Sequence, residues 1–125
     1  VRDIEVAIDM ATEVDERRLN YNFEYDRRAY EAVRRGLSQL VQKDGIEEAK
    51  ALALKLIEKG SYQIDCSDEG LMQDQIENCL RPVIAAVTGT SGGREWALEM
   101  LRHDRSGCLC EQELIELAGA ERRQG

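Results

Sequence analysis

Apolar residues recur every three or four positions along almost the whole chain, and this spacing limits the folds that the sequence can adopt. The chain contains a single proline and lacks runs of β-branched residues, so little in it favours a β-sheet. We therefore predict an all-α fold of about six helices arranged as antiparallel hairpins. A closed helical bundle and a short open stack of hairpins both satisfy this pattern.

The predicted helices begin and end at recognisable signals. Asp44 and Gly45 form the turn before the third helix, where we expect the glycine to adopt the left-handed conformation, and Gly60 ends that helix. Pro82 lies inside the fourth helix, and because the apolar stripe stays in phase on both sides, we expect one helix with a kink. The predicted helices cover residues 2–18, 25–43, 46–60, 68–87, 94–104 and 111–118, with a loop over 88–93 and a frayed tail over 120–125. In the helix over 94–104 we expect Ala97, Met100 and Leu101 to be buried and Trp96 to lie at the edge of the core.

The 125 residues suffice for a single domain, residues 1–125, with one hydrophobic core. The 25 acidic and 17 basic side chains give a net charge of −8, which argues against binding to nucleic acid. No apolar stretch reaches the length of about 20 residues that crosses a bilayer, and no signal peptide opens the chain, so we expect a cytoplasmic protein. Because the chain begins at Val1 without a methionine, a trimmed chain and a piece of a longer protein both remain open.

The second and third predicted helices carry small and apolar residues at a characteristic spacing. These residues are Val33, Gly36, Leu37 and Leu40 in the second helix and Ala49 and Ala53 in the third. At these positions residues 29–60 resemble one hairpin of the tetratricopeptide repeat family, although the family's Leu-Gly pair is inverted and the turn is one residue shorter. The resemblance implies a scaffold that docks a peptide or another protein.

The four cysteines and the single histidine supply the candidate metal ligands. A tetrahedral zinc site uses four thiolate or imidazole ligands, and here these would be His103, Cys108, Cys110 and Cys66. The competing interpretation is free or structural thiols. Cys79 lies on the apolar stripe of the fourth helix, where we expect it to pack as a small hydrophobe. The absence of a signal peptide argues against a disulfide framework.

Four of the six aromatic residues fall between positions 21 and 30. Residues 19–26 alternate between apolar and polar side chains, a period of two that is typical of an extended segment. We interpret the segment as a linker whose rings pack over the core. The alternative is an exposed patch for a protein partner, formed by Tyr21, Phe23, Tyr25, Arg27 and Arg28.

Arginines recur seven residues apart in the second predicted helix and therefore share helical faces. The two pairs are Arg27 with Arg34 and Arg28 with Arg35. We expect this basic stripe to be solvated and paired with neighbouring acids.

No set of residues in the sequence fits a reaction class. His103 and Asp104 are adjacent, so they do not face each other on a helix. The glycine-rich residues 89–94 lack the lysine and the spacing of a phosphate-binding loop, and no cofactor is implied. The sequence thus favours a non-enzymatic interaction or scaffold domain, although an active site assembled from distant residues is not visible at this level.

The expected partner is a protein or peptide that is basic or amphipathic, because the chain itself is acidic. We expect neither nucleic acid nor membrane as a partner, and the sequence does not indicate an oligomeric state. The alternative function is a zinc-stabilised or metal-sensing helical protein that uses Cys108, Cys110 and His103.

Overall fold

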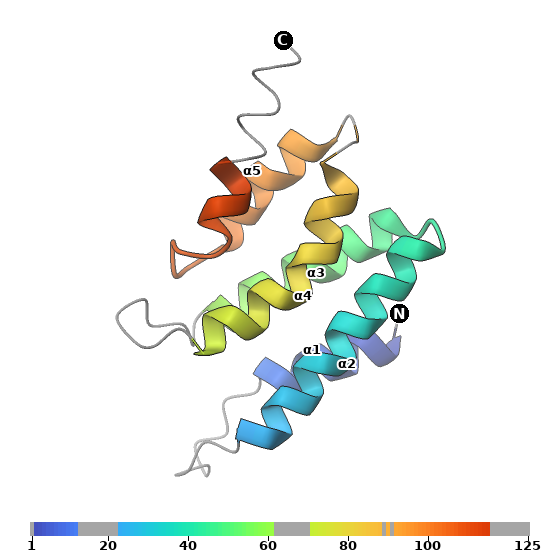
Figure 1. Ribbon diagram of the computed structural model, residues 1–125, viewed down its shortest axis with the longest axis vertical. Coiled ribbons are helices and arrows are strands. Elements are labelled where there is room, and N and C mark those ends of the chain that lie inside the picture. The colour runs from blue at the N-terminus through green and yellow to red at the C-terminus, as the bar shows by residue number, and fades with distance from the viewer. Residues whose placement is uncertain (1, 13–22, 62–70, 89, 91, 116–125) are drawn as a thin grey trace.

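The fold is all-α, as predicted, in a computed structural model that describes residues 2–12, 23–61, 71–88, 90 and 92–115 (Figure 1). Within these ranges the chain forms helices and no strand. The helices are α1 (Arg2–Thr12), α2 (Phe23–Gln42), α3 (Ile46–Gly60), α4 (Leu71–Val87) and α5 (Gly93–His103). A short helix over residues 111–115 follows α5. No helix in the described ranges has the length and apolar character needed to cross a membrane.

Helices α1, α2, α4 and α3 form a bundle in that spatial order. α2 packs against both α1 and α4, and α3 completes the ring because it contacts α4 and α1. α5 packs against α3. Figure 1 shows α2 and α4 side by side and running in the same direction. α3, which lies between them in the sequence, runs in the opposite direction.

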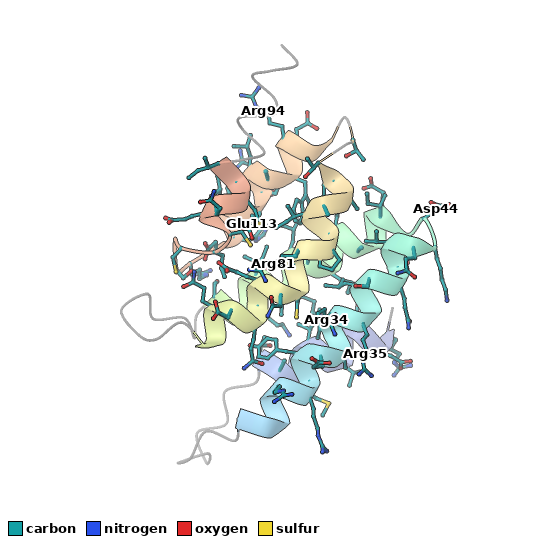
Figure 2. The ribbon with its side chains drawn as sticks, viewed as in Figure 1. Arg34, Arg35, Asp44, Arg81, Arg94 and Glu113 are labelled. Carbon is teal, nitrogen blue, oxygen red and sulfur yellow. The ribbon has the colours of Figure 1, made fainter. Side chains whose placement is uncertain are left out.

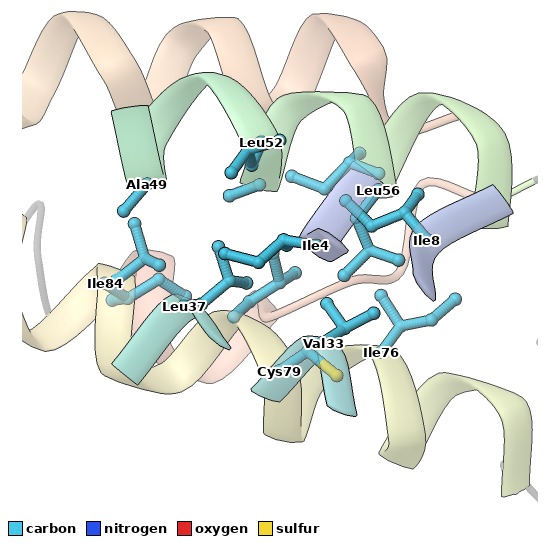
Figure 3. Packing of buried hydrophobic residues seen from close by; sticks show 14 of the residues in the cluster. Ile4, Ile8, Val33, Leu37, Ala49, Leu52, Leu56, Ile76, Cys79 and Ile84 are labelled. Carbon is cyan, nitrogen blue, oxygen red and sulfur yellow. The ribbon is translucent and has the colours of Figure 1, made fainter. Parts of the chain in front are cut away.

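The core lies among these four helices and consists of the apolar stripes that the helical spacing predicts. Figure 3 shows the stripes converging, with labelled side chains from each helix: Ile4, Ile8, Val33, Leu37, Leu52, Leu56 and Ile76. Burial of apolar surface is the main force that holds such helices together, since isolated helices of this length are marginal in water.

The covered face of α5 differs in part from the prediction. Trp96 was expected at the edge of the core but is 4% exposed, and its indole Nε1 donates a hydrogen bond to the Lys50 carbonyl over 3.2 Å. Leu101 was expected to be buried but is 52% exposed. The reason is that Trp96 and Met100, four residues apart, define the single face of α5 that meets α3, and Leu101 points off that face.

The turn between α2 and α3 uses Asp44 rather than Gly45 as its left-handed residue. Asp44 has φ 61°, whereas Gly45 has φ −88°. The Gly45 N–H donates to the Leu40 carbonyl over 2.7 Å, and the Asp44 N–H donates to the Val41 carbonyl over 3.4 Å. These two bonds form a Schellman motif, which fixes the left-handed residue one position before the glycine. A Cβ at Gly45 would lie 3.1 Å from the Leu40 side chain and carbonyl, so lack of space accounts for the glycine.

α4 continues through Pro82 as one helix, as predicted, and Figure 1 shows that it changes direction along its course. Proline has no backbone N–H, so the helix lacks the hydrogen bond that would join position 82 to the Asn78 carbonyl. The helix survives because its apolar stripe is buried on both sides of the proline, at Cys79 and Val83.

The segment after α5 positions the short 111–115 helix against α4. The Asp104 carboxylate accepts hydrogen bonds from the backbone N–H of Ser106 over 2.9 Å and of Leu109 over 3.0 Å. The Leu109 side chain then enters the core. The buried Glu77 carboxylate of α4 accepts a hydrogen bond from the Cys110 N–H over 2.8 Å, and a carboxylate is favoured at this positive end of a helix.

Candidate functional site

Two of the four cysteines are buried thiols. Cys79 is 1% exposed and Cys110 is fully covered, which confirms the prediction that Cys79 packs as a small hydrophobe. Burial raises the pKa of the Cys79 thiol to about 12, and that thiol donates a hydrogen bond to the Tyr30 carbonyl over 3.2 Å. Burial, reinforced by the Glu77 and Glu113 carboxylates, likewise raises the pKa of Cys110 to about 12. Both thiols therefore stay protonated at neutral pH and are poor nucleophiles, since the thiolate is the nucleophilic form.

The hypothetical metal ligands are His103, Cys108, Cys110 and Cys66. Within the described ranges, no three histidine, cysteine or carboxylate side chains are grouped so that they could hold a metal ion. His103 instead lies 3.9 Å from the Glu58 carboxylate and 3.7 Å from the Glu99 carboxylate. Cys108 is disulfide-bonded, and Cys66 lies outside the described residues.

The disulfide bond of Cys108 corrects the expectation that disulfides are absent. That expectation rested on the lack of a signal peptide, which concerns the redox compartment of the chain. The approach of two sulfur atoms is set by the fold, and the fold was not available to the sequence argument.

The aromatic segment departs from the prediction where the structure describes it. Residues 23–26 are helical and form the first turn of α2, which begins two residues before the predicted helix start at 25, whereas the period of two over residues 19–26 predicted an extended linker. Acidic residues are favoured in the first turn of a helix, and Glu24 and Asp26 provide them, but the alternation concealed this signal. Of the candidate partner-binding residues, Arg27 and Arg28 are exposed on the next turn. Tyr21 and the side chains of Phe23 and Tyr25 lie outside the description.

A groove with a volume of about 760 Å³ runs between α2 and α4, and we call it the α2–α4 groove. Each helix lines it with residues spaced three, four and seven positions apart, the spacing that places side chains on one helical face. The lining residues are Arg27, Tyr30, Glu31 and Arg34 from α2, and Asp74, Gln75, Asn78, Cys79, Arg81 and Pro82 from α4. Grooves of this size accommodate a peptide segment or a small ligand.

The α2–α4 groove carries charges of both signs, because its lining includes three arginines and two carboxylates. Arg27 is exposed and forms no ion pair with any residue in the described part of the chain. Arg34 lies 3.5 Å from the Glu31 carboxylate, and both partners are partly exposed, so water screens the pair. Figure 2 labels Arg34 on α2 and Arg81 on α4, the two helices that border the groove. The guanidinium groups thus leave donors available to an incoming anionic group.

Gln75, which lines the α2–α4 groove, has a side-chain amide that is buried without hydrogen bonds to any described residue. Its side-chain Nε2 and Oε1 atoms are both buried, and neither has a hydrogen-bond partner among the residues described. A buried polar group without a partner costs about 1–3 kcal/mol. Leucine or methionine would fill the same position without this cost, so the amide lowers the free energy of unfolding of the chain.

Pro82 removes a second hydrogen bond at the same groove. The Asn78 carbonyl does not receive the backbone N–H that position 82 would donate in a regular helix. Asn78 and Pro82 both line the groove, about one and two turns from Gln75.

The sequence matches no known protein family, and neither curated proteins nor solved structures gave a match. The functional argument therefore depends on the geometry of this chain alone.

Proposed function

We propose that this chain is a non-enzymatic helical interaction domain that docks a peptide or a helix in the α2–α4 groove. The observation that carries the proposal is the groove itself, which has a volume of about 760 Å³ and is lined by one face of α2 and one face of α4. A bound peptide or helix would cover both faces and bury their apolar surface.

The chemistry of the α2–α4 groove supports binding over catalysis. Its one potential nucleophile, the Cys79 thiol, has a pKa raised to about 12 by burial and is engaged with the Tyr30 carbonyl. The described lining contains arginines, carboxylates and amides, but no histidine that would act as a base near neutral pH. Arginines around a partly apolar floor are typical of protein interfaces.

The proposal is tested by selecting peptides from a random displayed library on the folded chain. Each selected peptide is then titrated by calorimetry against the wild type, Arg27→Ala and Arg102→Ala. Arg27 is exposed and lines the groove, whereas Arg102 is exposed on α5, away from the groove, so Arg102→Ala is the matched control. We expect peptides whose affinity falls several-fold in Arg27→Ala and is unchanged in Arg102→Ala. A selection that returns no peptide sensitive to Arg27→Ala would overturn the proposal.

A further inference from the structure

We draw no further inference here: the strongest candidate, the apolar surface patch that Leu98 and Leu101 form on the exposed side of α5, carries none because nothing in the described part of the chain shows what covers it.

Discussion

Replacement of Gln75 by leucine should raise the stability of the free chain. The wild-type amide buries two polar atoms that have no partner in the described part of the chain, at a cost of about 1–3 kcal/mol. Leucine has a similar size and no polar atoms, so it recovers part of that free energy. We expect the free energy of unfolding to rise by about 1 kcal/mol, which is a rise in Tm of roughly 3–6 °C for a chain of this length.

The measurement is thermal and urea unfolding of wild type and Gln75→Leu, followed by circular dichroism. Gln75→Ala serves as a control, because it removes the amide but leaves a void, and it should gain less stability than leucine or lose some. A loss of more than about 1 kcal/mol in Gln75→Leu would refute the reasoning, since it would mean that the amide has stabilising contacts in the folded chain.

Three further predictions concern the fold. Asp44→Gly should stabilise the chain by about 0.5–1 kcal/mol in urea unfolding, because φ 61° strains any residue with a Cβ; a loss of stability would contradict the Schellman assignment. Gly93→Ala should lower the free energy of unfolding by about 1–3 kcal/mol, because its Cβ would lie 2.6 Å from the Val87 carbonyl oxygen; an unchanged Tm would contradict this close approach. Burial raises the pKa of the Cys79 and Cys110 thiols from 9.0 to about 12, so the unfolded chain ionises first as pH rises. Stability, complete below pH 9, should therefore fall towards pH 12 by up to about 1.4 kcal/mol per pH unit for each thiol, and this slope should shrink in a variant with both cysteines replaced by alanine.

The helical core could be predicted because it depends on a regular spacing. The predicted and observed bounds of α3 agree at residues 46–60, where apolar residues at every third or fourth position meet a closing glycine. The spacing does not report how many neighbours a helix has. Leu101 was misjudged for that reason, since α5 packs against α3 on one narrow face.

Local signals were also misjudged where two of them competed. At Asp44-Gly45 we predicted the left-handed conformation for the glycine. The hydrogen bonds to residues 40 and 41 show that the aspartate adopts this conformation instead. At residues 23–26 an apparent period of two outweighed the acidic first turn of a helix. In each case the structure follows the backbone hydrogen bonds, which a residue pattern reports only indirectly.

The candidate site was visible in the sequence only in part. The spacing of Arg27 and Arg34 does place both on one face of α2, and the structure adds that this face borders a groove. Gln75 gave no signal, because a glutamine in a helix is usually a solvated residue. Its burial follows from the way α4 lies beside α2, a packing relation between segments some forty residues apart that no local pattern contains.

Two departures from the local rules of helix construction meet at the α2–α4 groove. A proline inside a helix removes a backbone hydrogen bond, and a glutamine with both polar atoms buried leaves two more groups without partners in the described chain. Elsewhere the buried polar groups that the structure describes are engaged, as Glu77 is with Gln73 and with the Cys110 N–H. The two residues lie on the same helix, about two turns apart, and both line the groove. Departures from the local rules of this kind are typical of functional sites, where the rest of the fold compensates for their cost.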